Sequence, residues 1–200
     1  MKQLGLKGKQ RKNDRYHSYR GKVGKVADNL LNRNFNASKP FEKLTTDVTQ
    51  FKVGDDKVYL SPVMDLYNRE ILSYSISLSP NLEQVREMLD GLFSKLPVDA
   101  APVFHSDQGW QYQHETYQRL LKEHNITQSM SRKGNCMDNG AMENFFGRLK
   151  VEMFYGEKFE SVNTFIEELE KYIDYYNNQR ISLKLKGMSP VQYRTHSLSI

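Results

Sequence analysis

Residues 71–96 read ILSYSISLSPNLEQVREMLDGLFSKL, and their hydrophobic period changes partway along. Between residues 71 and 78, apolar side chains alternate with serines, which predicts a β-strand with one buried face. Ser79 and Pro80 suit a helix cap and a first helical position, and the apolar residues after them recur every three or four positions. This apolar stripe consists of Leu82, Val85, Leu89, Leu92, Phe93 and Leu96. The stretch therefore predicts a strand followed directly by an amphipathic helix.

The sequence on either side extends this pattern. Two further strands are predicted before it, at residues 41–51 and 57–64, with a turn at Gly54-Asp55-Asp56 between them. Three strands joined by short turns predict an antiparallel meander. The later pattern predicts strands at residues 102–105 and 126–130, helices at about 117–124, 140–153 and 161–177, and a polar loop at 131–139. The order βββ-α-β-α-β-α-α predicts an α/β fold with a mixed five-stranded sheet and helices on both faces.

Positive charge is concentrated near the N-terminus. Residues 1–26 hold nine Lys or Arg and one acid, a net charge of +8, whereas the whole chain carries +5. Such a segment is typical of a nucleic-acid partner or of a solvated, disordered leader. We expect residues 1–38 to form a basic arm and residues 39–197 to form one ordered domain with a helical, basic C-terminal extension. That extension contains Arg180, Lys184, Lys186 and Arg194 and no acid after residue 176.

Cysteine content and hydropathy limit the cellular context. The single cysteine, Cys136, allows neither an internal disulfide nor a cysteine-rich zinc site, and we interpret it as a loop thiol. No apolar run is long enough to cross a bilayer, and the chain starts without a signal-peptide pattern. These features predict a cytoplasmic protein with no membrane partner. We interpret His105 and His124 as packing or hydrogen-bonding residues rather than ligands.

Two aspartates lie in or beside predicted strands. Asp47, in TDVT at residues 46–49, lies inside a strand, where aspartate is uncommon. Asp107, in HSDQG at residues 105–109, follows a strand at the end where ligands of α/β sheets gather. Gly109 lets the backbone turn or approach a ligand closely. Taken singly, each aspartate is explained as well by an acid facing solvent at an edge strand or by turn chemistry.

A third acid, Glu143, lies in the first turn of the helix predicted from Gly140. The helix dipole alone favours a glutamate at this place. Lys150 follows seven residues later on the same stripe, about 10 Å along the axis, which is too far for a simple helix salt bridge. Asp138 is a rival for the third acid, although it is better interpreted as a turn residue or a helix cap. Three carboxylates from three elements are the oxygen ligands that a pair of divalent cations needs.

Longer strings in the sequence carry a family resemblance. The strings are TDVT (46–49), HSDQG (105–109), SRKGNCMDNGAMENFFGRLK (131–150), YYNNQR (175–180) and MSPVQYR (188–194). They resemble the DDE transposases of bacterial insertion sequences, whose second reading frame encodes a catalytic core like that of retroviral integrases. The resemblance covers roughly residues 35–195 and implies the ribonuclease-H-like fold. The start of the chain resembles only the tail of the helix-turn-helix-like segment that precedes this core in the family.

The resemblance implies metal-dependent transposition, with Asp47, Asp107 and Glu143 as ligands of two Mg²⁺ or Mn²⁺ ions. Water would cut the end of the element to free a 3′-hydroxyl, and that hydroxyl would attack another phosphodiester. Lys150 would contact DNA. The other basic residues expected at the DNA are Arg132, Lys133, Arg148 and Arg180. The implied partners are the insertion-sequence ends, the target DNA, further copies of the chain and the upstream-frame protein of the same element, at the nucleoid.

Two other functions remain open. A metal-dependent nuclease on the same fold would cut DNA without joining it. A non-catalytic DNA-binding remnant of a decayed element would do neither. The intact acids Asp47, Asp107 and Glu143 argue against a remnant, whereas the short N-terminal segment argues for one.

Overall fold

The computed structural model describes residues 24–198 of the 200-residue chain, apart from the side chains of Cys136, Met137 and Leu198. Most of the predicted basic arm, residues 1–23, lies outside the described residues. The strands are β1 (Lys43–Thr46), β2 (Thr49–Val53), β3 (Asp56–Asp65), β4 (Ile71–Ser77), β5 (Val103–Ser106) and β6 (Thr127–Met130). The main helices are α1 (Leu82–Phe93), α2 (Glu115–Glu123), α3 (Gly140–Leu149), α4 (Val162–Asn178) and α5 (Pro190–Leu198). The shorter helical segments are η2 (Trp110–Gln113), η3 (Cys136–Asn139), the π-helical η4 (Lys150–Phe154) and η5 (Leu183–Leu185).

The strands form one mixed sheet. Strand β3 pairs antiparallel with β1, β2 and β4, which is the predicted meander, and β5 pairs parallel with both β1 and β6. Because β1 and β2 follow one another along the same side of β3, the six strands occupy five positions. The predicted mixed five-stranded α/β sheet is confirmed in this sense.

The single first strand predicted at residues 41–51 is wrong, because the strand is interrupted at Asp47 and Val48. The register stays in step across the gap, since Thr46 lies opposite Val63 and Thr49 opposite Leu60. The Val48 N–H donates instead to Asp47 Oδ1, at 2.8 Å, and is thereby diverted from the ladder. Pro62, which lies across the same gap, has no N–H to offer. The break therefore lies at the residue that the sequence marked as unusual in a strand.

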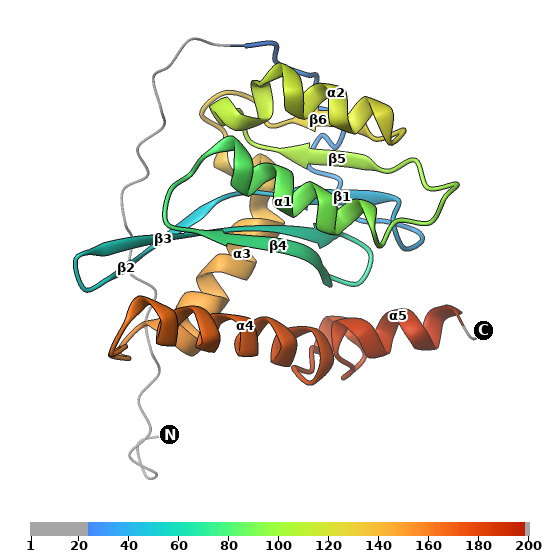
Figure 1. Ribbon diagram of the computed structural model, residues 1–200. Coiled ribbons are helices and arrows are strands. Elements are labelled where there is room, and N and C mark those ends of the chain that lie inside the picture. Colours follow the sequence, from blue (N-terminus) through green and yellow to red (C-terminus); the bar gives the residue numbers. More distant parts are fainter. Residues whose placement is uncertain (1–23, 199–200) are drawn as a thin grey trace.

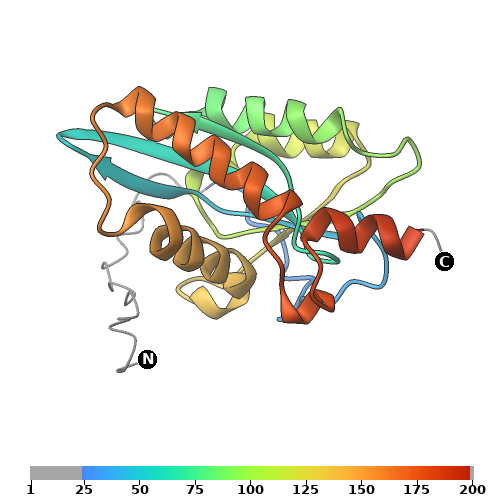
Figure 2. The same cartoon turned by 90° about the horizontal axis from the view of Figure 1, so that it is seen from below.

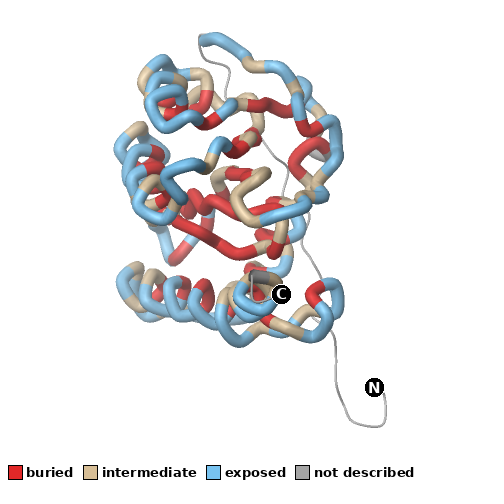
Figure 3. The backbone as a smooth tube through the Cα atoms, turned by 90° about the vertical axis from the view of Figure 1, so that its right-hand side faces the viewer, coloured by how far each residue is buried: buried red, intermediate tan, exposed pale blue. Residues whose placement is uncertain are grey.

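Helices cover both faces of the sheet and enclose two hydrophobic cores (Figure 1). Residues along β3 alternate between them, since Leu60 and Met64 belong to one core and Val63 to the other. Helices α1 and α2 cover the Val63 face, and α3, η4 and α4 cover the Leu60 face. Figure 3 shows the buried residues as inner layers between exposed outer surfaces. The helices on both faces are confirmed.

Capping side chains set where two of the helices begin. Helix α1 is capped by Asn81, whose side chain accepts a hydrogen bond from the Gln84 N–H at 2.9 Å. The predicted cap at Ser79 is therefore wrong, and Pro80 precedes the cap instead of opening the helix. Asn81 is the better cap because its position lets the oxygen reach an N–H of the first turn. Ser161 caps α4 through the Thr164 N–H, at 3.1 Å.

The C-terminal residues form a helix that the sequence did not predict as a separate element. Figure 2 shows α4 lying across the sheet and α5 lying beyond the C-terminal end of α4. Helix α5 is fastened to the turn between β3 and β4, where Arg194 pairs with Glu70 at 2.6 Å and Asn68 donates to the Pro190 carbonyl. Arg194, one of the basic C-terminal residues, is therefore used inside the fold.

The described part of the predicted arm packs on the domain. The Leu30 N–H donates to Ser129 Oγ at 2.9 Å, and the Met130 N–H donates to the Asp28 carbonyl at 3.2 Å. These contacts lay residues 28–30 along β6. Within residues 24–198, none of the helices combines the length and apolarity that a bilayer crossing requires.

Removing a core side chain of α4 should destabilise the protein strongly. Leu169 is 0% exposed in the core shared by β3, α3 and α4, so Leu169→Ala leaves a cavity and should lower the free energy of unfolding by about 2–5 kcal/mol. Urea denaturation followed by circular dichroism measures the change. Glu167→Ala, an exposed position on the same helix, is the matched control and should change it by less than about 0.5 kcal/mol. Equal losses in both variants would contradict the assigned core.

Candidate active site

The two predicted aspartates follow adjacent parallel strands. Strands β1 and β5 pair with a constant offset of 60 positions, so that Thr45 lies beside His105. Asp47 and Asp107 each lie two residues beyond that pair. Neighbouring strands are about 4.8 Å apart, so the same register carried two residues further sets the aspartates side by side. The two aspartates are therefore separated in the sequence by the same 60 positions as the paired residues of β1 and β5.

Electrostatics show that Glu143 lies within reach of this pair. Burial raises the pKa of Asp47 well above its usual range, and the negative charges of Asp107 and then Glu143 raise it further. The hydrogen bond from the Val48 N–H acts in the opposite direction. Asp107 and Glu143 therefore both lie near enough to Asp47 to act on its charge, and their joint role as metal ligands stays a prediction.

The turn after β5 is closed tightly on the Asp107 carboxylate. The Gly109 N–H donates to Asp107 Oδ1 at 2.8 Å, and a Cβ atom at residue 109 would lie 2.9 Å from that oxygen. Any larger residue would therefore displace the Asp107 carboxylate and the Gln111 side chain, whose amide nitrogen would lie 2.7 Å from that Cβ atom. The Gln108 amide fixes the turn from outside by donating to the Ser131 carbonyl at 3.0 Å. Gly109 lets the backbone turn, as predicted, and its N–H approaches the Asp107 carboxylate, whereas close approach to a ligand stays a prediction.

Glu143 lies in the first turn of α3, and the residue before this helix is tied to β1. Asn139 occupies the N-cap position, but its side chain makes no capping hydrogen bond. Its Oδ1 accepts from Thr45 Oγ1 at 2.6 Å, and its Nδ2 donates to the Thr46 carbonyl at 3.0 Å. The start of α3 is therefore joined to the end of the strand that carries Asp47.

Tyr112 is a core residue close to the carboxylates that the sequence did not single out. It lies in η2, five residues after Asp107, and its side chain is 0% exposed. Burial raises the pKa of Tyr112 well above its usual value, and the charges of Asp47 and Asp107 raise it further. The phenol therefore stays neutral and adds no further negative charge beside the carboxylates. Its nearness to Asp107 in the chain was the available signal, but a tyrosine there is equally typical of a core.

The donor set of the site suits a hard divalent cation, because Mg²⁺ prefers carboxylate oxygens. Within the described ranges, no group of three His, Cys, Asp or Glu side chains is already gathered at metal-binding distances. Asp47 interacts electrostatically with both Asp107 and Glu143.

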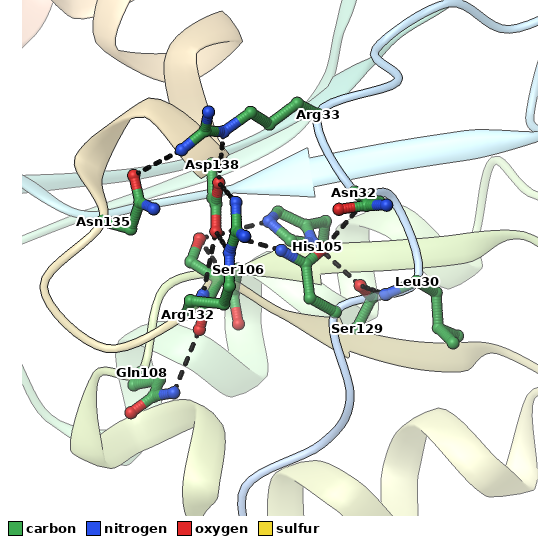
Figure 4. A network of polar contacts seen from close by, with 12 residues as sticks. Leu30, Asn32, Arg33, His105, Ser106, Gln108, Ser129, Arg132, Asn135 and Asp138 are labelled. Atoms are coloured by element: carbon green, nitrogen blue, oxygen red, sulfur yellow. Dashed lines mark hydrogen bonds and ion pairs between the residues drawn. The ribbon is translucent and has the colours of Figure 1, made fainter.

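Asp138, the rival for the third acid, is the centre of a separate ion-pair network (Figure 4). The Asp138 side chain is 0% exposed. Its carboxylate accepts hydrogen bonds from Nε and a terminal nitrogen of Arg132, at 2.9 Å each, and from Nε of Arg33 at 2.9 Å. The Arg132 N–H and the Asn29 amide complete the set at 3.1 and 3.0 Å. Hydrogen bonds from Arg132, and then from Arg33, hold the pKa of Asp138 well below its usual range.

This network decides among the roles suggested for Asp138. It lies in the short helix η3 and does not cap α3, so the helix-cap alternative is wrong. Its carboxylate is saturated by donors from residues about 105 positions upstream and from Arg132. The sequence could not reveal this role, because the partners Asn29 and Arg33 are close to Asp138 only after folding.

Both predicted histidine roles hold in the structure. His105 is fully buried between Ser129 Oγ at 2.8 Å and Ser131 Oγ at 3.1 Å, and burial lowers its pKa to about 4. It is therefore a neutral hydrogen-bonding residue at neutral pH. The His124 ring stacks on Phe93, with the ring centroids 3.5 Å apart.

Two of the arginines expected at DNA are engaged by acids of the fold. Arg132 is paired with Asp138, as described above, and Arg180 forms a two-pronged pair with Glu152, in which the shortest distance is 2.6 Å. The Arg180 side chain is 20% exposed. Each arginine therefore has a structural role, whatever else it binds.

The other three basic residues differ in their surroundings. The Lys150 amine lies 5.5 Å from the centroid of the Phe51 ring, beside β2. Arg148 is exposed on α3 and lies near Tyr176, whose pKa is raised by burial and in part lowered again by the charge of Arg148. Lys133 is exposed in the loop after β6. DNA contact by these residues stays a prediction.

Comparisons with known proteins agree with this geometry. Residues 37–136 match one family model described as an integrase core domain, and residues 143–198 match a second with the same description. An uncharacterized transposase-like protein of Haemophilus influenzae is 54% identical over 199 residues, which span 100% of this chain and 91% of that protein.

Two Escherichia coli relatives are named as transposases. The putative transposase InsK for insertion sequence element IS150 is 54% identical over 183 residues, which span 92% of this chain and 65% of InsK. The transposase InsF for insertion sequence IS3A is 33% identical over 100% of this chain and 69% of its own length. This chain therefore spans about two thirds of the length of InsK and InsF.

Solved structures share the fold at low sequence identity. The HTLV-2 integrase catalytic core domain, determined in complex with magnesium, superposes with a TM-score of 0.61 at 16% identity, covering 79% of this chain and 99% of that one. A chain of the simian T-cell lymphotropic virus intasome also superposes with a TM-score of 0.61, covering 85% of this chain and 56% of that one. The fold is that of an integrase-type catalytic core, of the ribonuclease-H-like class. With its relatives and domain matches taken together, the chain belongs to the DDE transposases of insertion sequences, in the IS3 family.

The Asp138 network should make stability depend on acid pH. Its folded-state pKa lies below the unfolded value of about 3.9, so the unfolded chain binds more protons in acid. Its contribution is thus present above about pH 4 and is lost as the pH falls further. Asp138→Asn should lower the free energy of unfolding at pH 7 and flatten its decline toward about pH 3. Urea unfolding across this pH range measures both effects.

The control for this prediction is Asp90→Asn, which removes an exposed acid of α1 whose partner Arg86 lies 3.8 Å away. It should leave the pH dependence of stability unchanged. Parallel curves for the wild type and Asp138→Asn would contradict the assigned role of Asp138.

Proposed function

We propose that this chain carries the catalytic core of an insertion-sequence transposase, with Asp47, Asp107 and Glu143 as its catalytic carboxylates. The observation that carries the proposal is the parallel register of β1 and β5, which places Asp47 and Asp107 at equivalent positions just beyond the ends of the two strands. Glu143 lies near enough to influence the pKa of Asp47. Membership of the transposase family supports the same assignment. The reaction class is phosphodiester displacement on DNA.

The same carboxylates would hold Mg²⁺ or Mn²⁺, as two ions. Magnesium in the HTLV-2 integrase core supports this cofactor class. Such ions, when bound, stabilise the attacking and leaving oxygens of the phosphodiester.

The contribution of the protein to the reaction is positioning. In the first step water cuts the strand at the end of the element and leaves a 3′-hydroxyl. In the second step that hydroxyl attacks a phosphodiester of the target, so that one bond is exchanged for another and no covalent protein–DNA intermediate is needed. The β1–β5 register and the tight turn at Gly109 hold Asp47 and Asp107 in place for both steps.

The partners follow from this chemistry. DNA is the substrate at both the insertion-sequence ends and the target, and we propose that the chain acts as an oligomer at the nucleoid. Solved relatives support assembly, since the HTLV-2 integrase core is described in trimeric and dimeric forms and another neighbour belongs to an intasome. The upstream-frame protein of the same element is a further proposed partner.

Substitution of the carboxylates should abolish the chemistry without unfolding the protein. Asp47→Asn, Asp107→Asn and Glu143→Gln should each reduce cutting and joining by about 100-fold or more, equivalent to about 2.7 kcal/mol of transition-state stabilisation. The assay uses Mn²⁺ and duplexes that carry the DNA flanking the gene. The melting temperatures of the metal-free variants should not fall, because each change relieves repulsion among the acids.

Asp55→Asn, at an exposed turn, is the control for these variants and should retain full activity. Joining that persists undiminished in Asp107→Asn would refute the site. Cutting without joining by the wild type would identify a nuclease, and DNA binding without either reaction would identify a remnant.

Lys150 should contribute one phosphate contact. Lys150→Gln should weaken binding of all DNA sequences alike and reduce the slope of log affinity against log salt by about 0.9. Fluorescence anisotropy between about 50 and 200 mM salt measures the slope. Lys158→Gln, an exposed lysine beyond η4, is the matched control. An unchanged slope in Lys150→Gln would remove this residue from the interface.

A further inference from the structure

Asn139 joins two parts of the chain that carry different acids of the site. Its side chain is 3% exposed, and both ends of its amide are used on β1, through Thr45 Oγ1 at 2.6 Å and the Thr46 carbonyl at 3.0 Å. An N-cap side chain ordinarily bonds to the N–H groups of its own helix, and this one does not. The hydrogen bonds of Asn139 therefore serve the contact with the strand rather than the start of α3.

The contact between Asn139 and β1 lies close in the sequence to both Asp47 and Glu143. Thr46 is the last residue of β1 and immediately precedes Asp47. Asn139 immediately precedes α3, of which Glu143 is the fourth residue. One helical turn rises about 5.4 Å, so Glu143 lies about one turn from the point of attachment. A shift of α3 along β1 would thus change the separation of the two acids directly.

The turn that carries Asn139 is also held from its other side. Asp138 is fixed by Arg132 and Arg33, at 2.9 Å each. These pairs anchor the turn to the loop after β6 and to residues 24–38, but neither reaches β1. Asn139 connects this anchored turn to β1, the strand that ends immediately before Asp47.

We propose that Asn139 is a positioning residue that fixes α3 against β1 and so sets the separation of Asp47 and Glu143 for divalent-cation binding. This inference rests on the proposed function. It addresses a specific need, since three mutually repelling carboxylates must be held near one another before a cation binds. An asparagine fits the position because one side chain supplies both the acceptor for a hydroxyl and the donor for a carbonyl.

The test measures Mn²⁺ binding by calorimetry on the whole chain, without DNA. Asn139→Ala should weaken Mn²⁺ binding by about 10-fold or more, the size expected when a residue that orients metal ligands is lost. Thr45→Val, which removes the hydroxyl that donates to Asn139, should weaken it less, and Thr45→Ser, which keeps a hydroxyl, should bind as the wild type does. The Thr45 pair keeps the test decisive if Asn139→Ala does not fold.

The control is Asn144→Ala on the same helix. Asn144 is exposed, and its amide donates to the Gly140 carbonyl of its own helix at 2.8 Å, so its loss should leave Mn²⁺ affinity unchanged. A second readout is the joining rate against Mn²⁺ concentration. Excess Mn²⁺ should restore the rate of Asn139→Ala but not that of Glu143→Gln, because only the latter lacks a ligand.

The outcomes separate this inference from the proposed function. Wild-type Mn²⁺ affinity in both Asn139→Ala and Thr45→Val, with only a lowered melting temperature, would overturn the positioning role and leave the proposed function intact. Mn²⁺ binding by the wild type that is insensitive to Asp107→Asn would overturn the metal assignment itself, and the inference with it.

Discussion

The parallel pairing of β1 with β5 is the constraint on which the rest of the structure depends. It lies in the middle of the sheet, with β3 on one side and β6 on the other, so both strands are held by backbone hydrogen bonds on each side. A slip of one residue would turn every side chain of β5 to the opposite face, taking Phe104 out of its core. The relation between Asp47 and Asp107 is therefore enforced by the burial of the whole sheet.

Glu143 depends on a different kind of support. It lies on a helix that follows an irregular loop, so no ladder of backbone hydrogen bonds fixes its distance from the strands. Side chains do this instead: the apolar face of α3 packs in the core against β3, Asn139 reaches β1, and Asp138 gathers two arginines. The candidate site thus combines a pair of acids held by the sheet with a third whose helix is held by core packing and a few polar contacts. Sites that use charge in this way commonly break the local rules of a fold, as Asp47 does by interrupting its strand.

The sequence predicted those features that arise from local pattern. Alternation and helical periodicity indicated the meander and most of the helices, and the resemblance indicated the fold and the three acids. The failures have different causes. The break at Asp47 arises from a hydrogen bond between neighbouring residues, whereas the saturation of Asp138 depends on Arg33, a residue distant in the sequence. The cap of α1 failed for a local reason, since Ser79 and Asn81 are both acceptable caps and geometry chose between them. Helix α5 was hidden because its residues form a basic segment whose fastening through Glu70 lies 124 positions away.

The segment before β1 covers one edge of the sheet. Strand β6 forms one edge of the sheet, and an open strand edge invites pairing with another molecule. Residues 28–30 lie along it, and the Met130 N–H and Ser129 Oγ are both occupied by that segment. Residues 28–30, which composition alone assigns to a basic arm, therefore shield the edge of β6. A fragment cut at residue 39 would keep every acid of the site and yet expose a strand prone to self-association.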